Sequence, residues 1–308
     1  MHIQCLALTP WREPLATIST KRCIDTGRVY QPGFAIYITF GIIRSHHPMK
    51  LYHYTDSAAI KAVLEYGRLW LSDIRYLNDH NEYKEGEKII RSVFEAKGAG
   101  LPAANVTKIM THLESYFDSS KASYTFIGSF SRGEDLLSQW RGYCPKAGGY
   151  ALEFEIDQLK DFGAPLHECI YDDAAKIANA ESLFDFAEKV IVHGKGNKSR
   201  FFQTTWANIA KFKNSGFSEE REVRAVIFKK QDDTAIRFRT RDSLLIPYIE
   251  IEVPYDKLKA VWVGPCQSPE LASESLSRFI EHLARDKKHP LASIAKPEVK
   301  LSNITFRG

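Results

Sequence analysis

From Met49 onward, the spacing of apolar residues along the chain changes between two periods, which limits the folds that the chain can adopt. In segments such as residues 124–131 and 150–156, every second side chain is apolar, which is typical of a half-buried β-strand. Between such segments lie longer ones whose apolar residues recur every three or four positions, which is typical of an amphipathic helix. The mixture predicts an α/β fold, in the sense of an α+β mixed sheet with helices packed against it.

Capping and turn residues set the expected boundaries of these elements. Asp56 or Ser57 can cap a helix that stops before Gly67, and Ser268 followed by Pro269 predicts another helix start. We expect strands at residues 51–55, 69–71, 124–131, 150–156, 222–227, 246–253 and 259–263, and helices at 57–64, 82–96, 103–117, 180–192, 199–213 and from 269 onward.

Residues 1–48 differ from the rest of the chain. They hold five Lys/Arg against two Asp/Glu, prolines interrupt them, and they lack a clean helical period. Two interpretations stay open: an N-terminal extension with one strand over residues 34–43, or a mis-annotated start, with translation beginning at Met49. In both cases residues 49–308 are expected to form a single α/β domain that folds without the first 48 residues.

Charge and cysteine content narrow the class of protein. The net charge is +4, but Lys/Arg and Asp/Glu nearly balance beyond residue 48, which gives no sign of a nucleic-acid-binding face. Five cysteines without a Cys-x-x-Cys pair argue against a disulfide framework or a structural zinc site. The longest apolar run, residues 34–43, is too short to cross a bilayer. We therefore expect a cytoplasmic protein that does not span a membrane, and its oligomeric state stays open.

Polar side chains on two predicted strands are candidates for ligand binding. His53 lies on a strand that enters a helix, a junction where polar side chains and free N–H groups meet ligands. Ser129 and Ser131 share one face of their strand. The alternatives are a hydrogen-bonded, partly buried histidine and a pair of hydroxyls that face solvent.

Trp140 and Tyr143 belong to a segment dense in large amphipathic side chains, residues 139–143. Such rings line ligand pockets, where they stack on a base or on nicotinamide. They also fill hydrophobic cores, and both interpretations stay open. In the first, Trp140 and Tyr143 border a ligand cleft.

The most unusual segment is residues 218–224, which is rich in charged side chains. Strand alternation sends Glu220, Glu222 and Arg224 to one face, opposite the core-facing Val223. One interpretation is a pair of carboxylates held in a cleft, with Glu222 outside the core. The other is an exposed edge with ion pairs that contribute little to stability.

Glu153, Glu155 and Asp157 also share a predicted strand face and could bind a divalent metal. No histidine or further acid lies at ligand spacing, so a solvated face is the favoured interpretation. We expect no metal site, and a metal-dependent nuclease is the least favoured function.

The order of these motifs resembles a bacterial family known as domain of unknown function 2971. The pattern is matched by segments 51–55, 69–74, 77–79 with Glu82, 129–131, 137–140 with Tyr143 and Gly149, Phe217 with 220–224, and 262–265. Each motif is short, but seven in order over about residues 50–266 are specific. The family name implies no activity.

A weaker resemblance is to the ADP-ribosyltransferases, which implies a split sheet with helices. Such enzymes begin with a strand-borne histidine followed by threonine, then a strand with serine or tyrosine, and end with a late strand that carries a catalytic glutamate. His53 with Thr55, Ser129 or Ser131, and Glu220 with Glu222 match this order. The departure is Arg224, which could neutralise Glu222.

The leading hypothesis from this resemblance is an enzyme that uses NAD as its substrate and transfers ADP-ribose, as a toxin or an antiviral defence effector. It implies that Glu222 is catalytic, assisted by Glu220. Cleavage of the nicotinamide–ribose bond develops oxocarbenium character, which a fixed carboxylate stabilises. The resemblance implies that the cofactor-binding residues are His53, Thr55, Ser129, Ser131, Trp140 and Tyr143. The macromolecular acceptor, protein or nucleic acid, stays open, and a non-catalytic ligand-binding or interaction module on the same fold is the alternative.

Overall fold

A ten-stranded mixed sheet organises the protein in the computed structural model. The structure describes residues 48–77, 82–118, 123–156 and 162–305, all within one unit that spans residues 43–308. The expected strand at residues 34–43 and the side chain of Asp157 lie outside the described residues. In the described part, no helix has the length and apolar character needed to span a membrane.

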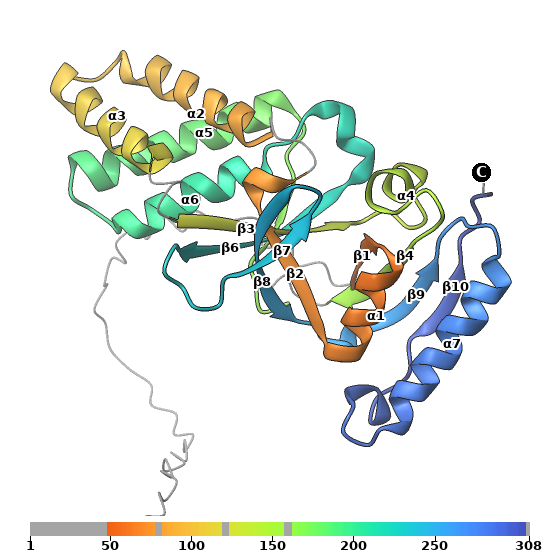
Figure 1. Cartoon of the computed structure of the whole chain (residues 1–308). Helices are drawn as coiled ribbons and strands as arrows, with labels where there is room; N and C mark the ends of the chain where they lie inside the picture. Colours follow the sequence, from red (N-terminus) through yellow and green to blue (C-terminus); the bar gives the residue numbers. More distant parts are fainter. Residues whose placement is uncertain (1–47, 78–81, 119–122, 157–161, 306–308) are drawn as a thin grey trace, which may run out of the picture. The chain divides into compact units, whose positions relative to one another are not determined.

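The sheet runs in the order β10-β9-β4-β1-β3-β2-β8-β7, with β6 added to β3 and β5 added to β6 (Figure 1). The pairs are antiparallel except β10 with β9, which is parallel. The strands are β1 (Met49–Thr55), β2 (Arg68–Asp73), β3 (Ser123–Ser131), β4 (Tyr150–Ile156), β5 (Leu166–Glu168), β6 (Glu222–Lys230), β7 (Arg237–Arg241), β8 (Leu244–Glu252), β9 (Leu258–Val263) and β10 (Glu298–Leu301). The predicted mixed α/β class is confirmed.

The sheet divides at β3. One edge of β3 pairs with β6 along its whole length, from Ser123 to Ser131. The other edge is shared, because β1 pairs only at Ser131 and β2 only at Phe126 and Ile127. β1 and β2 therefore diverge along this edge. That this division is the split sheet of ADP-ribosyltransferases stays a prediction.

Helices cover both faces of the sheet. On one face α1 (Ser57–Tyr66) and α7 (Pro269–Arg285) pack on an apolar cluster that includes Phe130 and Val223. On the other, α2 (Glu82–Gly98), α3 (Ala103–Asp118), α5 (Asp173–Ala187) and α6 (Lys198–Lys211) enclose a cluster with Ile127 and Val226. Figure 1 shows these four helices gathered at one end of the molecule. The short α4 (Leu137–Tyr143) covers this second face of the sheet near β1, where Trp140 packs in a third apolar cluster.

Local sequence signals explain several helix boundaries. Asp56 caps α1 by accepting from the amide of Ala59, and Gly67 ends the helix in the left-handed region, at φ 63°. Both were expected. Helix α5 begins at Asp173, seven residues before the predicted start, because Asp172 caps it by accepting from Ala175.

Candidate functional site

The chain kinks sharply between the two glutamates that the sequence singles out. Glu220 ends a 3₁₀ helix, Ser215–Glu220, and β6 begins at Glu222. Arg221 lies between them in the left-handed region, with φ 43° and ψ 50°, a conformation unusual for a residue with a Cβ atom. The expectation that Glu220 shares a strand face with Glu222 is therefore wrong. The kink, not strand alternation, turns both carboxylates toward one lysine.

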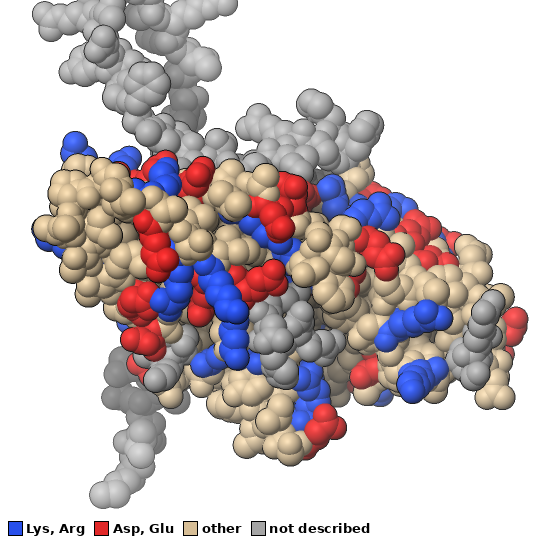
Figure 2. Space-filling view, turned by 90° about the horizontal axis from the view of Figure 1, so that it is seen from above, with Lys and Arg blue, Asp and Glu red and all other residues tan. Residues whose placement is uncertain are grey.

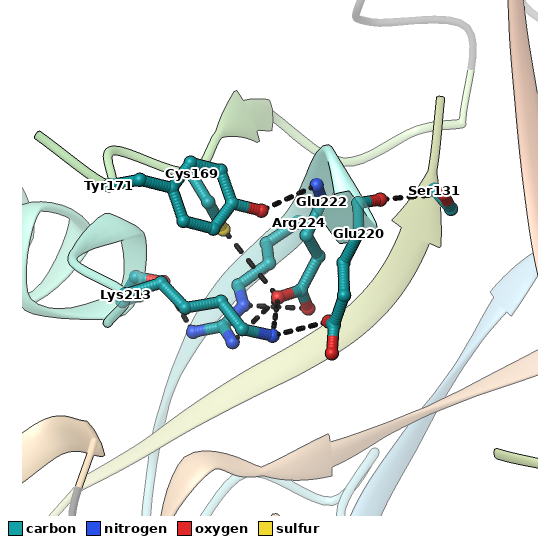
Figure 3. A network of polar contacts seen from close by, with 8 residues as sticks. Ser131, Cys169, Tyr171, Lys213, Glu220, Glu222 and Arg224 are labelled. Atoms are coloured by element: carbon teal, nitrogen blue, oxygen red, sulfur yellow. Dashed lines mark hydrogen bonds and ion pairs between the residues drawn. The ribbon is translucent and has the colours of Figure 1, made fainter. Parts of the chain in front are cut away.

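Lys213 lies between the two carboxylates (Figure 3). Its Nζ is 2.7 Å from Oε2 of Glu220 and 2.6 Å from Oε2 of Glu222. Arg224 donates to Glu222 twice, from Nε to Oε1 and from Nη2 to Oε2, each at 2.9 Å. Its Nη1 donates to the carbonyl of Ala210 near the end of α6, at 2.8 Å. We call Glu220, Glu222, Lys213 and Arg224 the charged network.

The charged network lies almost entirely inside the protein. The side chains of Glu222, Arg224 and Lys213 are 3%, 2% and 4% exposed, whereas that of Glu220 is 11% exposed. Burial alone would raise the pKa of Glu222, but the charges of Arg224 and Lys213 outweigh it and hold the pKa at about 2. Glu222 is therefore an ionised core residue, and the expectation that it lies outside the core is wrong. The suspected pairing with Arg224 is confirmed.

Neighbouring side chains hold the backbone of the kink in place. Ser131 donates from Oγ to the carbonyl of Glu220 at 2.6 Å and accepts from the amide of Gly133 at 2.9 Å. On the other side, the amide of Glu222 donates to the hydroxyl of Tyr171 at 2.8 Å. Ser131 is thus a positioning residue for Glu220. Figure 3 shows it on the side of the kink opposite Tyr171.

Helix α4 brings two further polar side chains to this face of the sheet. Burial raises the pKa of the Tyr143 phenol, and the nearby carboxylate of Glu222 adds to the shift. Gln139 lies one turn earlier, and so on the same side of α4 as Tyr143. It is 5% exposed, and its amide makes no hydrogen bond to another described residue. The sequence alone gives Gln139 no distinct role.

Trp140 points elsewhere. It is 5% exposed, its ring lies edge-on to Tyr54 at 4.7 Å, and its Nε1 donates to Asp135 at 2.8 Å. It packs in the third apolar cluster rather than beside the charged network. Of the two open interpretations of Trp140, the structure therefore favours core packing.

The register of three strands decides which predicted residues face one another. Tyr52 of β1 pairs with Ser131 of β3, which pairs with Glu222 of β6, so these side chains project from one face. His53 projects from the opposite face, where its ring lies 5.6 Å from that of Phe130. The structure does not bring His53 and Glu222 together, and this contradicts the expected shared cleft.

The His53 side chain instead makes a hydrogen bond to the backbone of β3, at the edge that β1 and β2 share. Its Nδ1 lies 2.9 Å from the carbonyl of Ser129 and must donate, since a carbonyl only accepts. Burial lowers the pKa of His53, so the ring is neutral at pH 7. The hydroxyl of Ser129 projects on the charged-network side, because Ser129 pairs with Arg224. Thr55 ends β1, where its carbonyl accepts from Sγ of Cys144 at 3.3 Å.

The acidic row on β4 does not form a metal site among the described residues. Oε1 of Glu153 meets Nζ of Lys50 and Oε2 meets Nζ of Lys300, each at 3.0 Å, while Trp262 donates to Oε2 at 2.8 Å. Within the described ranges, no three His, Cys, Asp or Glu side chains lie together as metal ligands. Glu153 is therefore a buried counter-ion for two lysines.

Lys213 is a further functional candidate that sequence reasoning missed. It lies just after α6, and no periodicity or motif distinguishes it from other lysines. Its place depends on residues distant in sequence, because the amide of Lys213 donates to the carbonyl of Ile170 at 3.1 Å. Only the tertiary fold brings it to Glu220 and Glu222.

The comparisons with known proteins agree with the predicted family. Residues 139–225 match the family described as "Protein of unknown function (DUF2971)". All four members of the charged network lie within the matched segment, as do Gln139 and Tyr143. Neither the search of curated proteins nor that of solved structures found a match.

Proposed function

We propose that the chain is an ADP-ribosyltransferase-like enzyme that uses NAD, with Glu220 rather than Glu222 as the carboxylate that meets the ligand. One observation carries this choice of residue. Both oxygens of Glu222 are occupied, whereas Oε1 of Glu220 makes no hydrogen bond to another described residue. Glu220 is also the more exposed of the two. In this proposal Glu220 takes the catalytic role that the resemblance implied for Glu222.

The chemistry needs a fixed negative charge beside a ribose. When the bond between the ribose C1′ and the nicotinamide nitrogen breaks, the electron pair leaves with nicotinamide and the ribose becomes oxocarbenium-like. The acceptor then forms a new bond to C1′ and loses its proton. Glu220, oriented by Lys213 and by the Ser131 hydrogen bond, would stabilise the positive charge. The free amide of Gln139 suits a carboxamide, and the Tyr143 ring suits stacking.

In this proposal Glu222 acts through its neighbours. It holds Lys213 and Arg224 in place as their buried counter-ion. Transfer of ADP-ribose to a cellular protein or nucleic acid would suit a toxin or an antiviral effector.

A second candidate is a non-catalytic ligand-binding module. It is favoured by the charge balance of the network, in which two cations match two carboxylates and leave no excess charge. Such a closed network stabilises a fold without any chemistry. NAD binding without release of nicotinamide would select this candidate.

The deciding experiment incubates the full chain with labelled NAD and cell lysate, and measures both nicotinamide release and label transfer. Glu220→Gln keeps the size of the side chain and removes its charge, so turnover should fall by about 10²-fold or more. Glu219→Gln is the matched control, since Glu219 is the exposed neighbour. Turnover that survives Glu220→Gln would remove Glu220 from the mechanism. A wild-type protein that releases no nicotinamide and transfers no label would end the enzymatic proposal.

A further inference from the structure

A second group of polar and aromatic side chains lies on β2, β8 and β7, away from the charged network. Ser72 pairs with Tyr248, and the register of β8 with β7 places Arg239 and Arg241 on the same face as these two residues. Arg239 donates from Nη2 to Oγ of Ser72 at 3.0 Å. Arg241 donates from Nη2 to the carbonyl of Tyr76 at 2.8 Å. Two guanidinium groups therefore come from alternate positions of one strand.

Arg239 has a buried hydrogen-bond donor with no acceptor. Among the described residues, only its Nε and Nε1 of Trp206 are side-chain polar atoms that are completely removed from solvent and make no hydrogen bond. Trp206 packs against the rings of Phe117 and Phe202, so its surroundings are apolar. Arg239 is charged and lies beside Ser72, where an acceptor oxygen would satisfy it.

The two arginines also have no ion-pair partner among the described residues. No carboxylate of the described residues lies within 4.0 Å of Arg239 or Arg241. Arg237 of the same strand differs, because its Nη2 lies 3.8 Å from Glu250. Burial lowers the pKa of Arg239, and the neighbouring charge of Arg241 lowers it further, while Asp56 and Tyr248 act in the opposite direction. The face thus carries positive charge that the described part of the protein does not neutralise.

An exposed aromatic ring accompanies this charge. Trp70 of β2 is 45% exposed, and its ring lies 4.5 Å from that of Tyr248, centroid to centroid. One side of the indole is supported by Tyr248, which leaves the ring available to a flat ligand.

We propose that this face binds a nucleoside diphosphate, with its phosphates on Arg239 and Arg241 and its base on Trp70. Guanidinium groups donate in a planar fork that matches phosphate oxygens, and an exposed indole stacks on any base. None of these residues belongs to the charged network. The inference therefore goes beyond the proposed function and does not depend on it.

The test is isothermal titration of the full chain with ADP and, separately, with inorganic pyrophosphate. Arg239→Gln and Arg241→Gln should each weaken both ligands by about tenfold or more, as expected for a lost charge-assisted hydrogen bond. Trp70→Leu should weaken ADP and leave pyrophosphate unchanged. Arg278→Gln is the charge-matched control, because it removes one arginine from the exposed surface of α7.

Three outcomes would overturn the proposal. The first is the absence of saturable binding of both ligands by the wild-type chain. The second is binding that Arg239→Gln and Arg241→Gln leave unchanged while their circular dichroism shows a normal fold. The third is binding of a single-stranded oligonucleotide but neither small ligand, which would assign the face to nucleic acid instead.

Figure 2 shows Lys/Arg and Asp/Glu side chains interspersed on the side of the molecule that it presents, without the continuous basic surface that is typical of a nucleic-acid-binding protein.

Discussion

Glu222 and Arg224, two residues apart on β6, bind each other through two parallel hydrogen bonds of 2.9 Å inside the protein. Side chains at this spacing project from the same face of a strand, so β6 alone brings the two side chains together. Lys213 adds a second positive charge beside Glu222, and the Ala210 carbonyl of α6 accepts from the guanidinium of Arg224. The pair therefore joins the sheet to the helical layer.

Glu222→Gln should lower the free energy of unfolding by about 3–5 kcal/mol, because it leaves Arg224 as a buried charge without its carboxylate. Urea denaturation measures the change. Glu219→Gln, on the exposed neighbouring residue, should change it by less than about 0.5 kcal/mol. A loss for Glu222→Gln as small as that of a surface ion pair, below about 1 kcal/mol, would show that the network contributes little.

Stability should also depend on pH through Glu222. Its pKa is held at about 2 in the folded protein, against an ordinary value of 4.5. A lowered folded-state pKa contributes stability that is present above pH 4.5 and is lost as the pH falls toward 2. The contribution is about 3 kcal/mol. The difference in unfolding free energy between wild type and Glu222→Gln should shrink over this range, and a difference independent of pH would contradict the assigned shift.

Trp140→Ala should cost about 3–5 kcal/mol of stability, as a large-to-small change in a packed core. The reason is the contact of Trp140 with Tyr54 and its hydrogen bond to Asp135. Thermal and urea denaturation check the loss, and ligand titration of the surviving folded protein should give an unchanged affinity. Weaker ligand binding at unchanged stability would instead place Trp140 at the border of a ligand cleft.

Two serines of β3 offer a matched pair. Ser131→Ala should destabilise the protein by about 1–3 kcal/mol, because the amide of Gly133 and the carbonyl of Glu220 lose their shared partner. Ser129→Ala should change stability by less than about 0.5 kcal/mol, since the Ser129 hydroxyl makes no hydrogen bond to a described residue. Equal effects of the two changes in urea denaturation would refute the positioning role of Ser131.

The hydrophobic period of the sequence predicted helices and strands well where one face of the element is buried. The alternation around Phe126 and Phe130 placed β3, and Asp56 with Gly67 placed both ends of α1. It failed for the first turns of α5, where small and polar side chains around Asp173 hide the helical period and only the Asp172 cap marks the start.

The candidate site was predictable only in part. The charged segment around Glu222 drew attention to the right place, and its pairing with Arg224 follows from strand geometry. The left-handed Arg221 could not be predicted, because no glycine or asparagine marks it. The expected convergence of His53 with Glu222 was wrong. The register pairs Ser131 with Tyr52 rather than with His53, and the sequence does not fix this register between two strands.

The divided edge of β3 has a consequence for how the protein unfolds. Among the described strands, β3 alone joins the half that contains β1, β4, β9 and β10 to the half that contains β2, β8 and β7. A circular permutation that opens the chain within β3 would leave β6 as the one uncut described strand that bridges the two halves, because β6 pairs with β3 along its whole length. It should therefore lower the melting temperature more than a permutation that opens the β7–β8 turn, which leaves β3 uncut.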